Sequence, residues 1–181
     1  MHSLKSISIT AICTVLLFVV VAFVACKKKD VVYNDTTLIR PCDNVICLNG
    51  GACNDGICFC ASGYEGQKCA SKWSDKFVGN YKASDACDTT SKGYLVNILA
   101  VVNVASQIRI DNIGLACPGT SIFANINPEK TTFNIPSQTT CGNIYLSGNG
   151  NISGNYINIF LKQRDSTNHT SNDCSIVLDR Q

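Results

Sequence analysis

Charged residues are scarce in this chain, and their scarcity reduces the number of functional classes to which it can belong. Only 15% of the 181 residues are Asp, Glu, Lys or Arg, and the formal net charge is +2. Proteins that bind nucleic acid usually carry a strongly basic face, and this net charge is too small and too dispersed to form one. We therefore expect no nucleic-acid partner. Hydrophobic residues make up 45% of the chain. This share excludes a largely disordered protein, because disordered chains carry too few apolar groups to form a core.

Groups suited to catalysis are also few. The chain has two histidines, and only His169 lies outside the amino-terminal region. His169 shares a polar segment with Asp165 and Asp173, but exposed turns have the same composition, so we expect no metal site. The sequence has no phosphate-binding glycine loop, serine elbow or paired-carboxylate motif. We therefore expect neither an enzyme nor a cofactor.

Cysteine, by contrast, is abundant. The chain contains 12 cysteines in 181 residues. Cytosolic thiols stay reduced and reactive, whereas exported proteins use cysteines for disulfide bonds. The cysteine content therefore indicates an oxidising compartment.

The amino terminus has the layout of a secretory signal. Lys5 precedes an almost uncharged run over residues 7–25, which ends at Cys26 and three lysines. A positive start followed by an apolar segment is typical of export signals. Residues 23–26, Phe-Val-Ala-Cys, resemble the lipobox of bacterial lipoproteins. That resemblance implies a signal peptide over residues 1–25 and a mature chain that begins at Cys26, whose thiol carries lipid as a membrane anchor.

Two alternatives concern the same segment. The first alternative is an uncleaved membrane helix, because about 19 apolar residues in a helix could span a hydrocarbon core of about 30 Å. The second alternative is simple secretion. An ordinary signal-peptidase site has a small residue three positions before the cut, and Phe23 at that position is too large. Setting Cys13 and Cys26 aside leaves 12 − 2 = 10 cysteines, an even number for disulfides. Residues 26–41 have no sustained hydrophobic period, so we expect an extended, lipidated tether.

Six cysteines lie within the 28 residues from Cys42 to Cys69. Their spacing is C-x4-C-x5-C-x4-C-x-C-x8-C. A segment this short cannot form a sufficient hydrophobic core, so cross-links must stabilise it. The segment contains no histidine, which favours disulfides over zinc. Six cysteines alone allow 15 pairings.

The sequences CLNGGAC at 47–53 and CFCASGYEGQKC at 58–69 resemble the epidermal growth factor (EGF)-like family. That resemblance implies an EGF-like domain over residues 42–69, which acts as a spacer or an adhesive unit. It also implies the bridges Cys42–Cys53, Cys47–Cys58 and Cys60–Cys69. Calcium-binding members carry acidic and amide residues just before the first cysteine. Residues 38–41 are Leu, Ile, Arg and Pro, so we expect no calcium site.

After Cys69 we expect a short hinge over residues 70–75. The sequence pattern of residues 73–181 then predicts a β domain. Apolar residues alternate with polar ones through most of this region, and a helical period is almost absent. The expected strands span 77–83, 94–104, 108–110, 122–126, 133–135, 144–146, 157–161 and 176–178. The glycines of residues 147–155 are expected between strands, in turns or bulges. About eight strands joined by short turns predict an antiparallel meander closed as a barrel or folded as a sandwich.

The opening FVGNY at 77–81 resembles the first strand of lipocalin-like barrels. That resemblance implies an apolar interior and, as one alternative, a carrier of a small apolar ligand. Tyr81 stands where the family has tryptophan, and the domain is shorter than a full lipocalin. Because eight short strands enclose a space that their own side chains can fill, we expect a packed interior.

Four cysteines remain in the β domain, and three pairings of them are possible. In a closed meander the first and last strands are neighbours, which brings Cys87 towards Cys174 and leaves Cys117 for Cys141. We therefore expect the pairs Cys87–Cys174 and Cys117–Cys141.

Three short sequences, DTT at 35–37, DTT at 88–90 and DST at 165–167, resemble the O-glycosylation motif of Bacteroidetes surface proteins. They make Thr36, Thr89 and Ser166 candidate glycosylation sites. The order of lipobox, EGF-like module and β domain resembles exported lipoproteins of Bacteroidetes. We therefore expect a protein of the cell envelope, anchored by lipid to the outer membrane on its periplasmic or surface face. Its expected role is non-enzymatic interaction or adhesion with a protein or glycan partner. A eukaryotic adhesion protein with an uncleaved anchor helix is a further alternative.

Overall fold

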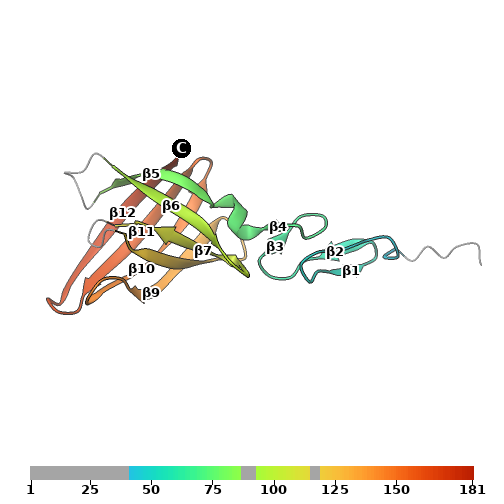
Figure 1. The fold of residues 1–181 in the computed structure, drawn as a ribbon, viewed down its shortest axis with the longest axis horizontal. Helices are drawn as coiled ribbons and strands as arrows, with labels where there is room; N and C mark the ends of the chain where they lie inside the picture. Colours follow the sequence, from blue (N-terminus) through green and yellow to red (C-terminus); the bar gives the residue numbers. More distant parts are fainter. Residues whose placement is uncertain (1–40, 87–92, 115–118) are drawn as a thin grey trace, which may run out of the picture. The chain divides into compact units, whose positions relative to one another are not determined.

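A computed structural model describes residues 41–86, 93–114 and 119–181 (Figure 1). The expected signal peptide, the expected lipidation site Cys26 and the expected tether up to residue 40 lie outside the described residues. The same is true of Cys87, Cys117, Thr36 and Thr89.

Residues 42–69 form a disulfide-rich module. Its hairpin pairs β1 (Ala52–Asn54) with β2 (Ile57–Phe59). Asp55 and Gly56 make the turn with positive φ angles of 48° and 82°, which Asp tolerates and Gly adopts freely. The bridges join Cys42 to Cys53, Cys47 to Cys58, and Cys60 to Cys69. These are the three pairs that the sequence resemblance implies.

The segment expected as a hinge is ordered. Strand β3 (Tyr64–Glu65) pairs with β4 (Ser71–Lys72), and a single 3-10 turn, η1 (Trp73–Lys76), follows at once. The Asp75 carboxylate accepts a hydrogen bond of 2.9 Å from the Lys72 N–H and so caps this turn. Phe77 ends η1 with helical backbone angles. The first barrel strand therefore begins at Gly79, and the expected start at Phe77 is wrong.

Eight antiparallel strands form a closed barrel (Figure 1). The strands are β5 (Gly79–Asp85), β6 (Tyr94–Val101), β7 (Val104–Asp111), β8 (Ser121–Ile126), β9 (Thr132–Thr139), β10 (Ile144–Ser153), β11 (Tyr156–Asp165) and β12 (Thr170–Arg180). Each pairs with its neighbour in the sequence, and β12 pairs with β5 to close the ring. The structure confirms the eight-strand antiparallel meander and shows that it is a barrel.

Two features of the strands differ from expectation. The pattern expected over residues 94–104 is split by a turn at Val102 and Asn103, where Asn103 has a φ of 64°. Val102 is 82% exposed as a result. The period-two pattern continues in sequence through the turn, so it did not reveal the break. In the glycine-rich stretch, β10 continues through Gly148 and Gly150, where the sequence predicts a break between strands. The expected bulge and turn are present, because the register with β9 shifts between Leu146 and Gly148 and the chain turns at Gly154.

Apolar side chains from alternate strand positions fill the barrel. The fully buried residues include Phe77, Tyr81, Val96, Ile98, Ile108, Ile110, Ile122, Phe133, Ile135, Ile157, Ile159, Leu161, Ile176 and Leu178. They belong to one contiguous cluster. Within it, the rings of Phe77 and Phe133 meet edge to face with centroids 5.6 Å apart.

A polar contact joins the last strand to the first. The Arg180 guanidinium donates hydrogen bonds to the Tyr81 hydroxyl, at 2.7 and 3.1 Å, and to the Lys76 carbonyl at 2.6 Å. Tyr81 in turn donates to the Phe77 carbonyl at 2.6 Å. These bonds tie η1 to both strands at the seam between β12 and β5.

Candidate functional site

A hollow of about 430 Å³ lies on the outer wall of the barrel, over β9 to β12. Its lining carries two cations, Lys162 and Arg164, and the aromatic ring of Tyr145, and carbon atoms make up more of its exposed surface than polar atoms do. The hydroxyls of Ser137, Ser147, Ser166 and Ser171 complete it. A volume in this range suits a small ligand or one part of a larger ligand.

The strand register explains why these side chains gather. Tyr145 lies opposite Arg164, which lies opposite Ser171, and this makes one row across three strands. Ser147 lies opposite Lys162 in a second row, which continues to Asp173. Directly opposite residues of antiparallel strands share a face.

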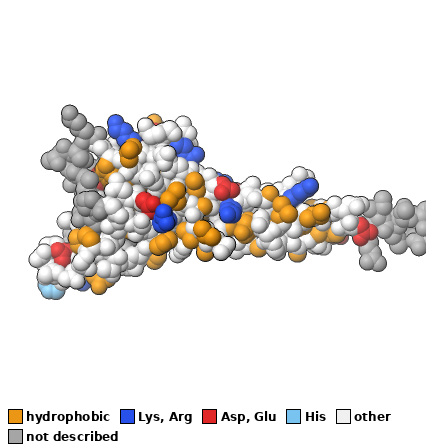
Figure 2. Space-filling view, viewed as in Figure 1, with side chains coloured by type: hydrophobic (Ala, Val, Ile, Leu, Met, Phe, Trp, Pro, Cys, Tyr) orange, Lys and Arg blue, Asp and Glu red, His pale blue; other side chains and the backbone are white. Residues whose placement is uncertain are grey.

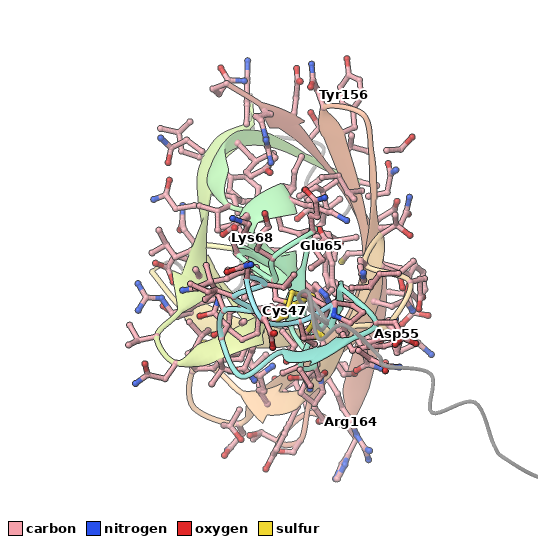
Figure 3. All side chains as sticks on the ribbon, turned by 90° about the vertical axis from the view of Figure 1, so that its right-hand side faces the viewer. Cys47, Asp55, Glu65, Lys68, Tyr156 and Arg164 are labelled. Carbon is pink, nitrogen blue, oxygen red and sulfur yellow. A yellow bond between two sulfur atoms is a disulfide. The ribbon has the colours of Figure 1, made fainter. Side chains whose placement is uncertain are left out.

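These two rows point away from the core. The neighbouring positions Leu146 and Leu161 are buried, and successive strand residues point to opposite faces. The rows therefore face outward, and Figure 3 shows Arg164 projecting away from the barrel ribbon.

The β11–β12 turn holds Ser166 at the rim of the hollow. Its N–H and its hydroxyl each donate to the Asn143 carbonyl at 3.1 Å. The Asp165 carboxylate accepts bonds from the N–H groups of Thr167, at 2.8 Å, and Asn168, at 3.3 Å. These backbone bonds lower the pKa of Asp165 below its ordinary value. Ser166 is the one expected glycosylation site among the described residues, and it is exposed.

The β9–β10 turn lies at the same end of the wall. The Ile144 N–H donates to the Cys141 carbonyl at 3.1 Å, and the Ile144 carbonyl accepts from the Thr140 N–H at 2.9 Å. Cys141 is disulfide-bonded, which adds a covalent restraint to this turn.

The expected pairs Cys87–Cys174 and Cys117–Cys141 stay predictions, because Cys87 and Cys117 lie outside the described residues. Cys141 and Cys174 are each disulfide-bonded. The ladder between β5 and β12 extends to Ala86, whose N–H donates to the Ser175 carbonyl at 3.0 Å.

A second group of polar residues links the disulfide-rich module to the barrel. Glu65 of β3 forms ion pairs with Lys76 of η1, at 3.0 Å, and with Lys130 of the β8–β9 turn, at 3.1 Å. The Lys130 ammonium also lies 5.6 Å from the centre of the Trp73 ring, a cation–π distance. Trp73 donates from its indole nitrogen to the Tyr64 carbonyl at 3.1 Å.

Gly63 brings the backbones of the two parts together. It has a φ of 91°, and a Cβ at this position would lie 2.9 Å from the Ser106 nitrogen and 3.0 Å from the Ala105 Cβ. Only glycine fits this contact with β7 without displacing a neighbour.

Exposed apolar side chains form a different kind of surface. Leu95, Leu99, Val102 and Val104 are exposed on or beside β6 and β7, and Figure 2 shows hydrophobic side chains gathered over this face. The disulfide-rich module exposes Ile46, Leu48, Ile57 and Phe59.

The described residues contain no group of three or more His, Cys, Asp or Glu placed to hold a metal ion. In the same part of the chain, no helix is both long and apolar enough to cross a bilayer.

Comparison with models of known protein families and with curated proteins found no match to this sequence. The candidate site therefore stands on its own geometry. Of the residues that line the hollow, Ser166 alone was indicated by a sequence motif. The sequence does contain a pattern that indicates the two cations. Lys162 directly follows the apolar Leu161, and Arg164 lies two residues further on, so both fall on the opposite face of the strand from Leu161.

Proposed function

We propose that this chain is a lipid-anchored protein of the cell envelope that binds a protein or glycan partner without catalysing a reaction. In this proposal Cys26 carries the lipid, residues 26–41 are the tether, and residues 42–69 are an EGF-like spacer. The barrel is the part that meets the partner, and the outer membrane is the proposed location.

The filled interior of the barrel is the observation that carries the proposal. Side chains such as Phe77, Phe133 and Ile159 occupy the space in which a lipocalin-like carrier would hold its ligand. The interior therefore does not favour the carrier alternative, and recognition is assigned to the outer surface. Disulfide bonds support an exported location, because they persist in oxidising compartments.

The anchor is tested by substitution of its cysteine in the host cell. Cells that express Cys26→Ala should incorporate no labelled fatty acid into the protein and should release it from the membrane fraction. Cys13→Ala is the matched control, because it removes a thiol from the same apolar region without touching the proposed attachment site. If Cys26→Ala stayed membrane-bound, an uncleaved helix would replace the lipid in this account.

A further inference from the structure

We infer that the hollow on the outer wall binds an acidic sugar residue of a glycan, a ring that carries a carboxylate group. This inference rests on the proposed function, because it names the class of partner that the barrel would meet. Its elements are the two cations, the serine hydroxyls and the Tyr145 ring, which converge on one outer face.

Lys162 and Arg164 supply the positive charge. They lie two residues apart on β11, so their side chains leave the same face at about 6.6 Å spacing along the strand. Asp173 lies opposite Lys162 in the register, so the two rows hold two cations and one carboxylate. The guanidinium of Arg164 can bind a carboxylate through two parallel hydrogen bonds, which a bare ammonium cannot do.

The remaining lining matches the rest of a sugar ring. Serine hydroxyls donate and accept hydrogen bonds, as the hydroxyls of a sugar do. Tyr145 is 41% exposed, so its ring offers an apolar face and its phenol a polar edge. A hollow of about 430 Å³ is larger than a simple anion needs.

An acidic peptide fits this surface less well. Extended peptides commonly bind by adding a strand to a free sheet edge, where backbone hydrogen bonds supply the affinity. The two central strands under the hollow, β10 and β11, are each paired with a strand on both sides. The hollow therefore offers side chains and no strand edge.

The rim is held in place before a ligand arrives. Ser166 is fixed by its two bonds to the Asn143 carbonyl, and Asn143 also donates from its side chain to the Thr167 hydroxyl at 2.7 Å. A site ordered in advance loses less conformational entropy on binding.

Isothermal titration calorimetry of the full-length protein in detergent tests the inference. The probes are tetragalacturonate as the acidic sugar, cellotetraose as the neutral sugar, tetraglutamate as the acidic peptide and sodium sulfate as the simple anion. Tetragalacturonate should bind, cellotetraose should not, and tetraglutamate and sulfate should bind at least tenfold more weakly. Tight binding of cellotetraose, equal binding of tetraglutamate or sulfate, or no binding of tetragalacturonate would each overturn the inference.

Variants then locate the binding. Arg164→Gln and Lys162→Gln should each raise the Kd for tetragalacturonate by about tenfold or more, as expected for the loss of a charge-assisted hydrogen bond. Tyr145→Ala should raise it about threefold to tenfold, whereas Tyr145→Phe keeps the ring and should change it less. Lys68→Gln is the matched control, because it removes one exposed positive charge from the disulfide-rich module. If Lys68→Gln weakened binding as much as Arg164→Gln, the attraction would be general and the inference wrong.

This test separates the inference from the proposed function. A lipidated Cys26 together with no binding of tetragalacturonate would leave the anchored protein in place and remove the sugar site. Binding that depends on Arg164, together with a bare Cys26, would keep the site and remove the anchor.

Discussion

Phe133 occupies the space that a side chain at position 150 would need. A Cβ on Gly150 would lie 2.3 Å from the Phe133 Cζ, far inside van der Waals contact. Phe133 and Gly150 face each other in the register of β9 and β10. The glycine in a strand interior is therefore explained by the ring packed over it.

Gly150→Ala should destabilise the barrel by about 1–3 kcal/mol, because it forces the Phe133 ring out of a packed core. Urea unfolding measures the change. Gly79→Ala is the control, since its Cβ would meet only ordinary contacts of 3.4 Å or more. The double variant Gly150→Ala with Phe133→Leu should lose less stability than the two single changes added together. Equal effects of Gly150→Ala and Gly79→Ala would contradict the packing account.

Tyr81 contributes through its hydroxyl as well as its ring. Tyr81→Phe would remove the hydroxyl that donates to the Phe77 carbonyl, and it would leave the Arg180 guanidinium with the Lys76 carbonyl but without the Tyr81 oxygen as an acceptor. We expect a loss of about 1–3 kcal/mol in the free energy of unfolding, because an unsatisfied buried group costs more than the bond itself contributes. Tyr156→Phe, at a half-exposed tyrosine of β11, should change stability little in the same urea titration. A Tyr81→Phe protein as stable as the Tyr156→Phe protein would show that the hydrogen bonds of the Tyr81 hydroxyl contribute nothing to the free energy of unfolding.

At the level of elements, the β8–β9 seam has the shortest ladder in the barrel. The two strands pair only at Asn125 with Asn134 and at Ile126 with Phe133. Away from these two pairs, the side chain of Gln138 on β9 bonds the backbone of Phe123 on β8, where a ladder would have a backbone partner. It accepts from the Phe123 N–H at 2.8 Å and donates to the Phe123 carbonyl at 2.6 Å.

Gln138→Leu should therefore open this seam. We expect a loss of about 1–2 kcal/mol, because two backbone groups lose their partner, and faster hydrogen exchange at the Phe123 amide. Gln107→Leu is a suitable comparison, because the Gln107 side chain donates to another side chain, Asn125, at 3.0 Å and not to a backbone group of this seam. Unchanged exchange at Phe123 in Gln138→Leu would mean that the seam is held by other contacts.

The sequence predicted the strands better than their ends. Alternation placed Val96, Ile98, Ile108 and Ile110 in the core, and all four are buried. It could not locate the turn after Val101, because a valine of the turn continues the same alternation. The number of strands and the short turns predicted a barrel or a sandwich, because either arrangement lowers the exposed edges of a meander. The structure shows that it is the barrel.

The hollow could be predicted only in part. Alternation along β11 was enough to place Lys162 and Arg164 on an outer face. The approach of Ser137, Tyr145 and Ser171 depends on the register of three ladders, which includes a shift between Leu146 and Gly148. A one-residue slip would move each of these side chains to the other face. Sequence patterns do not fix register at that precision.

At the scale of the whole molecule, Glu65 links the disulfide-rich module to the barrel. Burial raises the pKa of Glu65, but the hydrogen bonds and charges of Lys76 and Lys130 outweigh it and leave the pKa below its ordinary value of 4.5. A carboxyl with a lower pKa in the folded state binds fewer protons there than in the unfolded chain. Its contribution is therefore complete above about pH 4.5 and is lost as the pH falls through the lowered value.

Glu65→Gln should lower the free energy of unfolding by about 1 kcal/mol at most near pH 7, because these ion pairs are only partly buried. The difference from the unmodified protein should shrink as the pH falls below 4.5. Urea titrations at a series of pH values measure it, with Asp55→Asn in the exposed β1–β2 turn as the control. A Glu65→Gln effect that grew on acidification would have the wrong sign for this account.

The most direct measurement for the whole account is the intact mass of the protein purified from its host membranes. We predict the mass of residues 26–181 with added acyl groups, less ten hydrogens for the ten cysteines left in disulfides. Reduction should restore those hydrogens and leave the acyl groups in place. A mass that includes residues 1–25, or a mature chain with an unmodified Cys26, would contradict the lipid-anchored placement.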